Sequence, residues 1–358
     1  MTARERFLET FRFGKPDRPY MMPQWTFGDT IRRWQSEGMP TDVHFAEYFG
    51  FDRFEVVPLN LGLIPGIAEE VVEETATHRL VVDELGGKRK VWKDREIGMP
   101  MWIDYPLRNR DTWQQFKRRL DPNCPIRYPQ YWEDLKRCWK GRDYPLGVNA
   151  GSYYGWIRNW MGMEHLAVLY YDDPDLVREM TDYVGEFVLG VIRRAVEEVD
   201  LDFAQYWEDM AMKTGSLIAP SLFREYMTPN YRRVNEFLRA HGIDIHMVDS
   251  DGNVDELIPL WLEVGVNFVY PMEVAAGCDV LRYREDYGQE LIMMGGIDKR
   301  ALRFGKAEVE EEVMSKVPQL VPGGGFSPMV DHAVPPDVPL ANFQHYLDLC
   351  REVYASVS

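Results

Sequence analysis

The chain has 358 residues, 45% of them hydrophobic, and its 58 acidic and 41 basic side chains give a net charge of −17 at pH 7. This acidity argues against a nucleic-acid partner, because binding to phosphates needs a basic surface. No apolar run approaches the ~20 residues that span a bilayer, and the first residues lack the apolar stretch of a signal peptide. The four cysteines form no CxxC pair, which predicts free thiols in a cytoplasmic protein.

Eight short apolar runs, most of them followed by a segment with helical periodicity, organise the chain. Such alternation is typical of parallel strands with crossover helices, and eight strands predict a (β/α)8 TIM barrel formed by a single domain, 1–358. Each run ends in polar residues, which in a barrel meet at one mouth. The runs are 20–25 (YMMPQW), 54–60 (FEVVPLN), 146–152 (LGVNAGS), 203–209 (FAQYWED), 245–251 (IHMVDSD), 268–273 (FVYPME), 291–298 (LIMMGGID) and 326–332 (FSPMVDH).

The elements between these runs follow in chain order. A first helix is expected over 3–13, and short helices over 29–37 and 42–49 lie between the first two strands. The segment of about 62–142 breaks the rhythm, because 71–77, 80–84 and 88–94 alternate like antiparallel strands, and 111–120 and 131–139 are helical. We interpret it as an insertion, a hairpin plus helices, after strand two. The remaining helices are expected over 175–199, 220–241, 253–264, 279–287, 306–320 and 340–356.

The densest cluster of chemically useful residues is Asp249-Ser-Asp251-Gly-Asn253. Alternation along a strand puts Asp249 and Asp251 on one face, together with Met247. Two converging carboxylates repel each other unless a cation, a shared proton or several donors offset the charge. The alternative is that one of the two caps the next helix and the other is solvated, which accounts less well for both.

A second pair, Asp331-His332, ends the last strand and would face Asp249 and Asp251 across the mouth. A lone histidine is usually structural, but this one lies beside an aspartate at a strand end. His246 is out of register with Asp249 and is expected to be a core histidine.

Three further acidic residues end other strands: Asp209, Glu273 and Asp298. Oxygen ligands with one imidazole suit Mg, Mn or Zn, and we predict a metal held by Asp249, Asp251, His332 and Glu273. Surface acidity can produce the same pattern in so acidic a chain. Aromatic residues crowd the same strand ends, and although packing explains most of them, a few would line a pocket for a ring-bearing substrate. The residues expected there are Trp25, Tyr154, Tyr206 and Trp207.

On these motifs the chain resembles the uroporphyrinogen decarboxylase superfamily of (β/α)8 barrels, which also contains cobalamin-linked methyltransferases. The similarity runs over essentially the whole length. Its most specific parts are 45–62 (FAEYFGFDRFEVVPLNLG), 206–229 (YWEDMAMKTGSLIAPSLFREYMTP), the Asp249–Asn253 block, 295–302 (GGIDKRAL) and 323–339 (GGGFSPMVDHAVPPDVP). The resemblance also implies a homodimer formed through the barrel mouths.

The chain departs from both branches of the superfamily. The decarboxylases carry an arginine-rich segment after the first strand, whereas here 23–28 reads PQWTFG and the first arginine is Arg32. The aspartate that pairs with their substrate falls at Arg53, and only His332 matches. The methyltransferases bind zinc through a His-x-Cys pair and a later Cys. Alignment puts Asp249 and Asp251 at the first two positions and His332 at or near the third.

The resemblance therefore implies a methyltransferase that moves a methyl group between a small O- or N-methyl substrate and a corrinoid carried by a partner protein. Asp249, Asp251 and His332, with Glu273, would hold a divalent metal, zinc by family likeness, that polarises the substrate heteroatom. Asp209 would act as general acid or base. The alternative is a cofactor-free decarboxylase or lyase on a carboxylated substrate, with His332 and Asp209 handling protons. A binding protein that has lost the chemistry is the third, least favoured interpretation.

Overall fold

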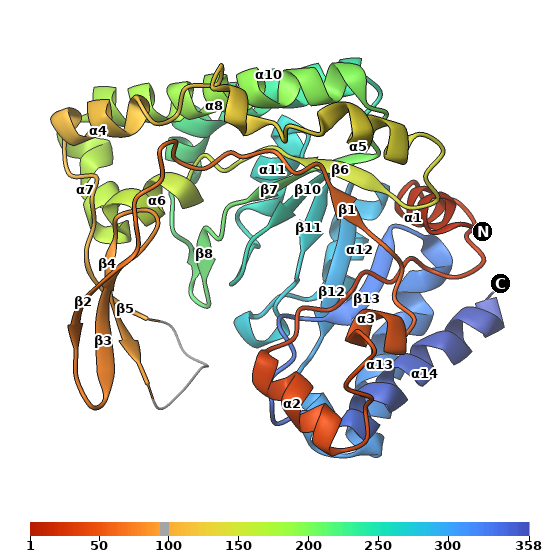
Figure 1. The fold of residues 1–358 in the computed structure, drawn as a ribbon. Coiled ribbons are helices and arrows are strands. Elements are labelled where there is room, and N and C mark those ends of the chain that lie inside the picture. The colour runs from red at the N-terminus through yellow and green to blue at the C-terminus, as the bar shows by residue number, and fades with distance from the viewer. Residues whose placement is uncertain (94–99, 358) are drawn as a thin grey trace.

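The computed structural model describes residues 1–93 and 100–357. Its centre is a curled, barrel-like sheet of seven parallel strands, in the spatial order in which they follow along the chain (Figure 1). This confirms the predicted barrel class and seven of the eight predicted strands. The strands are β1 (Glu55–Val56), β6 (Leu146–Asn149), β7 (Phe203–Trp207), β10 (His246–Asp249), β11 (Phe268–Tyr270), β12 (Ile292–Ile297) and β13 (Phe326–Val330).

The first predicted strand, 20–25, is not a strand, because its hydrogen bonds to the neighbouring segments are isolated and form no regular ladder. Pro23 removes one N–H donor, but a proline does not by itself exclude a strand, since β13 contains Pro328. The segment 20–25 still lies between β1 and β13. The Met21 carbonyl accepts from the Asp52 N–H at 2.8 Å on one side, and the Tyr20 carbonyl accepts from the Ser327 hydroxyl at 2.6 Å on the other.

Helices cover the outside of the sheet where the sequence predicts them. Their starts follow local chemistry: Asp173 caps α8 by accepting from the Leu176 N–H, and Pro174 occupies the first turn. The predicted 220–241 helix is interrupted by a π turn, Phe223–Met227, and the predicted 253–264 helix begins only at Ile258. The helices include α2 (Gly28–Ser36), α3 (Phe45–Tyr48), α6 (Gly155–Met161), α7 (Met163–Asp172), α8 (Pro174–Glu198), α9 (Pro220–Leu222), α10 (Thr228–Ala240), α11 (Ile258–Val264), α12 (Val280–Tyr287), α13 (Lys306–Leu320) and α14 (Leu340–Val357).

The predicted insertion lies between β1 and β6, and its sheet projects beside α6 and α7 (Figure 1). It is an antiparallel sheet of four strands in sequence order, followed by helices. The end of the third predicted insertion strand, 94, falls outside the described residues, and the sequence analysis missed the fourth strand. The elements are β2 (Glu70–Glu74), β3 (His78–Val82), β4 (Lys88–Trp92), β5 (Met101–Asp104), α4 (Arg110–Lys117) and α5 (Trp132–Trp139).

Side-chain alternation separates two apolar cores. Residues on the inner face of the sheet form one cluster inside the barrel, and residues on the outer face pack against the helices. Helix α1 (Ala3–Phe11) closes the amino end of the barrel, because Phe7 and Phe11 contact Phe203 and Phe268, the first residues of β7 and β11. The opposite end of the barrel, at the carboxyl ends of the strands, carries the polar side chains of the candidate site.

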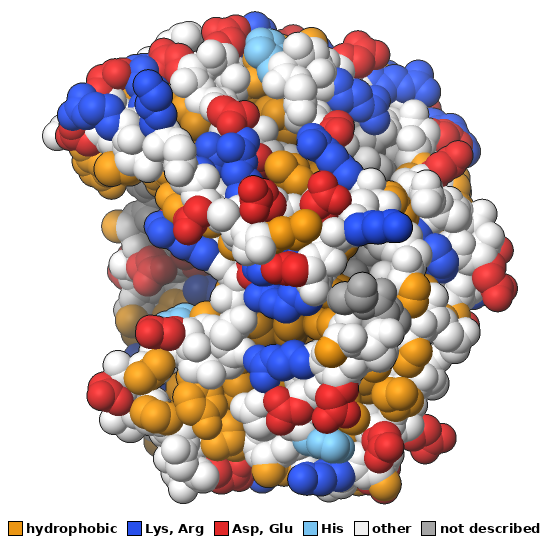
Figure 2. Space-filling model, turned by 90° about the vertical axis from the view of Figure 1, so that its right-hand side faces the viewer, with side chains coloured by type: hydrophobic (Ala, Val, Ile, Leu, Met, Phe, Trp, Pro, Cys, Tyr) orange, Lys and Arg blue, Asp and Glu red, His pale blue; other side chains and the backbone are white. Residues whose placement is uncertain are grey.

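Among the described residues, no helix is both long and apolar enough to cross a bilayer. On the face shown in Figure 2, basic and acidic side chains lie interspersed. That mixed surface agrees with the net charge in offering no extended basic patch on this side.

Candidate active site

Asp249 is the last residue of β10, and its side chain points into the barrel. Met247 lies on the same inner face, whereas Val248 packs in the outer core. His246 is fully buried on the outer side, where its two ring nitrogens lie 2.9 and 3.0 Å from backbone carbonyls, and burial lowers its pKa to about 4. The alternation predicted from the sequence is therefore confirmed, and His246 is a core residue.

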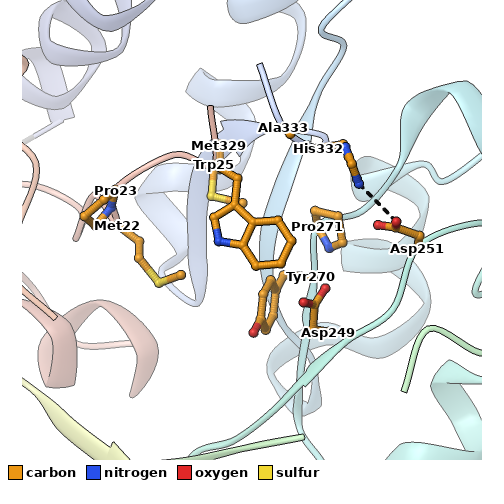
Figure 3. A pocket seen from close by; sticks show the side chains of 10 residues that line it. All are labelled: Met22, Pro23, Trp25, Asp249, Asp251, Tyr270, Pro271, Met329, His332 and Ala333. Atoms are coloured by element: carbon orange, nitrogen blue, oxygen red, sulfur yellow. Dashed lines mark hydrogen bonds and ion pairs between the residues drawn. The ribbon is translucent and has the colours of Figure 1, made fainter. Parts of the chain in front are cut away.

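Asp249 lies in a pocket of about 330 Å³ at the mouth of the barrel. Figure 3 shows its carboxylate directed into the pocket, whereas Asp251 turns toward His332. The described residues of the wall are mostly apolar, and none of them is lysine or arginine. The lining residues are Met22, Pro23, Trp25, Asp249, Asp251, Tyr270, Pro271, Met329, His332 and Ala333.

Burial makes Asp249 an unusually weak acid. Desolvation, followed by repulsion from Asp251 and Asp209, raises its pKa to about 8, against an ordinary value of 3.8. No described residue donates a hydrogen bond to its carboxylate. Its backbone carbonyl, by contrast, accepts from the Glu208 N–H at 2.9 Å, which fixes the strand end. Asp249 is therefore a protonated carboxylic acid near neutral pH, able to donate a proton to a ligand in the pocket.

His332 and Asp251 form an ion pair across the mouth. Their Nε2 and Oδ2 atoms are 3.0 Å apart, and both side chains are partly exposed. The contact with Asp251 raises the pKa of His332. The pocket thus holds two proton-bearing groups of different kinds, a neutral acid and an imidazole biased toward its cationic form.

Asp209 is engaged outside the pocket. Its Oδ2 lies 3.1 Å from Nη2 of Arg158, and its carbonyl accepts a second hydrogen bond from the same guanidinium. Asp209 adopts a left-handed backbone conformation with φ of 46°, which turns the chain away at the end of β7. The carboxylate is thus held by a permanent cation, and the role of Asp209 as general acid or base stays a prediction.

Glu208, on the opposite face of the same turn, is a structural anchor. It is fully buried. Its carboxylate fixes the loop after β6 and the start of α6 to the end of β7. The donors are Ser152 Oγ, the Tyr231 hydroxyl and the backbone N–H groups of Tyr153, Tyr154 and Gly155.

The predicted ligand Glu273 is held by a lysine. Its Oε1 lies 3.1 Å from Nζ of Lys299, and its Oε2 accepts from the Gly252 N–H at 3.0 Å. Lys299 also lies 3.5 Å from Asp331, which is buried and whose pKa is raised by desolvation. Asp298 pairs with Arg300 on the outer surface, at 2.7 Å.

The predicted metal site is not formed by this arrangement. Within residues 1–93 and 100–357, no three His, Cys, Asp or Glu side chains are grouped so as to hold a metal ion. Asp249, Asp251 and His332 line one pocket, where Asp251 contacts His332, whereas Glu273 contacts Lys299. Two of the four predicted ligands are therefore paired with each other and a third is paired with a lysine, so the four do not gather around one point.

The four predicted aromatic residues divide into two pairs. Trp25 is 59% exposed and lines the Asp249 pocket, and Trp207 lines a neighbouring cavity. Tyr206 faces the helix layer instead, where its hydroxyl donates to Asn235 at 2.7 Å. Tyr154 is buried at the start of α6. Neither tyrosine lines the Asp249 pocket, because alternation turns Tyr206 outward and the Glu208 anchor draws Tyr154 inward.

The sequence analysis did not identify two cationic residues of this region. Arg158 lies in the middle of α6, a helix that the sequence analysis did not identify, so no strand-end signal marks it. Lys299 directly follows the seventh predicted strand, and its place after Asp298 is a signal that could have found it. Each forms an ion pair with a carboxylate at a strand end, Arg158 with Asp209 and Lys299 with Glu273.

The fold and the site together define a barrel-type enzyme with an acid–base pocket at the carboxyl ends of its strands. Residues 93–353 match the family model described as uroporphyrinogen decarboxylase (URO-D). The match covers most of the chain, and the chain therefore belongs to the uroporphyrinogen decarboxylase family.

Individual relatives are distant. The uroporphyrinogen decarboxylase of Sulfurimonas denitrificans is 22% identical over 187 residues, 51% of this chain and 50% of that protein. That of Sulfurovum sp. is 21% identical over 183 residues, again 51% and 50%. The chain thus spans about half the length of the curated relatives that it matches. A methyltransferase from Methanosarcina mazei has the same fold, with a TM-score of 0.59 and 15% identity over 99% of both chains.

Proposed function

We propose that this protein transfers a methyl group from a small, uncharged O- or N-methyl compound to a corrinoid carried by a partner protein. The observation that carries the proposal is Asp249, a carboxylic acid whose pKa of about 8 keeps it protonated, in an otherwise largely apolar pocket. The likeness in fold to a methyltransferase over the whole chain supports the same direction.

The chemistry needs a proton at the leaving heteroatom. Breaking a bond between a methyl carbon and oxygen or nitrogen leaves an electron pair on the heteroatom, and an alkoxide or amide is a poor leaving group. Asp249 gives its proton to that atom as the methyl group moves to the acceptor, so an alcohol or amine departs. Water then returns a proton to Asp249, and the charges balance over the cycle.

His332 would orient the substrate in this mechanism. Its Nε2 is occupied by Asp251, which leaves Nδ1 for the substrate or a water molecule. Asp251 acts as a positioning residue, because it holds the ring and favours its charged form. In this proposal Asp249 takes over the role of heteroatom activation that the sequence assigned to a metal. No step depends on zinc, since the predicted ligands are not gathered.

The corrinoid is the second substrate, and when bound it supplies the cobalt that accepts the methyl group. The exposed indole of Trp25 offers the flat macrocycle an apolar contact at the mouth. The chain's own contribution is to bind the methyl donor, exclude water from Asp249 and deliver one proton.

The second candidate is a cofactor-free decarboxylase or lyase acting on a carboxylated substrate. Family membership and the names of the curated relatives favour it, and the two proton-bearing groups would serve it as well. The charge of the pocket argues against this second candidate. Of the residues that the structure describes, the pocket is lined by two aspartates and by no lysine or arginine that could receive a carboxylate.

The test is an anaerobic assay with free cob(I)alamin and 1,2-dimethoxybenzene, in which methylcobalamin is followed by its absorbance. Wild type and Asp298→Asn are expected to form it, because Asp298 lies at a strand end but outside the pocket. Asp249→Asn is expected to lose at least a hundredfold in rate. Equal rates for Asp249→Asn and wild type, or no methylcobalamin from any of the three, would contradict the proposal. Release of CO2 from 2-methoxybenzoate would favour the second candidate.

A further inference from the structure

A second and larger hollow, of about 920 Å³, opens at the mouth beside the Asp249 pocket. Three of its residues come from α6, and others come from the ends of β1, β6 and β7. None of the lining residues within 1–93 and 100–357 is charged. We call it the tryptophan compartment, after the residues that shape it: Trp156, Trp160 and Trp207, with the amides Asn60, Asn149 and Asn159.

The compartment adjoins the candidate active site through one pair of residues. Trp207 and Asp249 are Cα partners in the parallel ladder between β7 and β10. Neighbouring strands lie about 4.8 Å apart, so the two side chains stand next to each other on the inner face. Trp207 lines the compartment and Asp249 lines the smaller pocket. A ligand longer than one ring could therefore occupy both.

The three asparagine amides supply hydrogen-bond donors to the compartment. The Asn60 and Asn149 Oδ1 atoms accept from the backbone N–H two residues further on, at 2.9 and 2.8 Å. The Asn159 Oδ1 accepts from Arg158 at 3.2 Å. With their oxygens engaged inside the protein, all three amides have their NH2 groups left to donate. The compartment thus offers hydrogen-bond donors and no formal charge.

Aromatic walls favour flat rings, and donors without a charge favour neutral acceptors over anions. A carboxylate here would lose its hydration without gaining a cation. We propose that the tryptophan compartment binds the body of an uncharged aromatic compound that carries carbonyl or ether oxygens. The placing of that compound's methyl-bearing end at Asp249 rests on the proposed function, whereas ring binding in the compartment does not.

The experiment uses benzamide and benzoate, which share a ring and differ in charge. The full-length protein is labelled with 5-fluorotryptophan, and fluorine NMR follows each indole during titration. Trp207→Phe, Trp156→Phe and Trp160→Phe assign the three resonances. Benzamide is expected to shift the Trp207 and Trp156 signals, with benzoate binding at least tenfold more weakly.

Asn149→Asp tests the donor with little change in shape, because it replaces an NH2 group by an oxygen. It is expected to weaken benzamide at least fivefold, and Asn123→Asp, in an exposed loop, is the matched control. Benzoate binding as tightly as benzamide, benzamide shifting neither resonance, or Asn149→Asp leaving affinity unchanged would each overturn the inference. Asp249→Asn is expected to bind benzamide like wild type. Binding with these properties but without methyl transfer would therefore refute the proposed function and leave the compartment intact.

Discussion

His332 and Asp251 lie 3.0 Å apart although their strands, β13 and β10, are separated in the sheet by β11 and β12. The contact therefore ties together distant parts of the mouth. Because Asp251 raises the pKa of His332, Asp251→Asn is expected to lower that pKa toward 6.5. NMR titration of the His332 ring protons measures the change, and an unaltered pKa would contradict the pairing.

The His332–Asp251 pair is also expected to contribute to the free energy of unfolding in a way that depends on pH. A histidine whose pKa is raised on folding adds stability that is complete below pH 6.5 and is lost as the pH rises through the folded pKa. Both side chains are partly exposed, so the contribution is expected to stay below ~1 kcal/mol. Urea unfolding of wild type and Asp251→Asn at pH 5.5 and 9 measures it.

Asp249 is expected to destabilise the fold that carries it. Its pKa rises from 3.8 to about 8 on folding, so between these values the unfolded chain binds fewer protons and stability falls as the pH increases. Asp249→Asn removes this loss. Relative to wild type, the variant should gain ~1.4 kcal/mol for each pH unit in that window. Urea unfolding at pH 5 and pH 7.5 tests this, and an identical pH dependence in both proteins would argue against the raised pKa.

The reaction rate is expected to fall above pH 8. Asp249 donates a proton in the proposed reaction, and only its protonated form can do so. The rate should therefore drop by about tenfold per pH unit once the pH exceeds the pKa of about 8. A profile of kcat from pH 6 to pH 10 measures this. A rate that rises through pH 8 would instead indicate a base.

Glu208→Gln is expected to destabilise the protein by about 3–5 kcal/mol. The buried carboxylate accepts from five donors, and an amide in its place turns one acceptor into a donor that faces them. Glu225→Gln, which breaks an exposed ion pair with Arg178, serves as control and should change stability by less than ~1 kcal/mol. Urea denaturation compares them. Equal values would show that the anchor is unimportant.

Metal removal is expected to leave methyl transfer unchanged. Among the predicted ligands, Asp251 and His332 contact each other and Glu273 contacts Lys299, so elemental analysis of the purified protein should find less than one equivalent of bound Zn, Mn or Mg. Dialysis against a chelator should not alter the rate. A stoichiometric metal that is lost in the Asp249→Ala/Asp251→Ala double variant would restore the metal site predicted from the sequence.

Local patterns were enough to predict the architecture. Short apolar runs identified seven strands, helical periodicity identified most helices, and alternation along the strand placed Asp249 inward and His246 outward. Position 23 shows the limit of such patterns. The run 20–25 has the hydrophobicity of a strand and contains Pro23, but β13 contains Pro328 and is nevertheless a paired strand. Hydrophobicity and proline content therefore do not distinguish the two runs.

The sequence could not predict which cation each acidic strand-end residue contacts. Asp251 and Glu273 look equivalent as acidic strand ends, yet one contacts a histidine and the other a lysine. Which cation a carboxylate meets depends on loop paths and helix positions that no short pattern encodes. Arg158 illustrates this, since it reaches Asp209 from a helix 51 residues earlier in the chain.

The wall of the Asp249 pocket that segment 20–25 forms is attached to the sheet by fewer regular hydrogen bonds than the other walls. Met22, Pro23 and Trp25 belong to a stretch joined to its neighbours by scattered contacts, not by a continuous ladder. Asp249 and Tyr270 belong to the regular sheet. Displacing the wall at 22–25 therefore breaks few hydrogen bonds and leaves all seven strands paired. This wall can therefore adjust to the shape of a ligand without moving the strand that carries the acid.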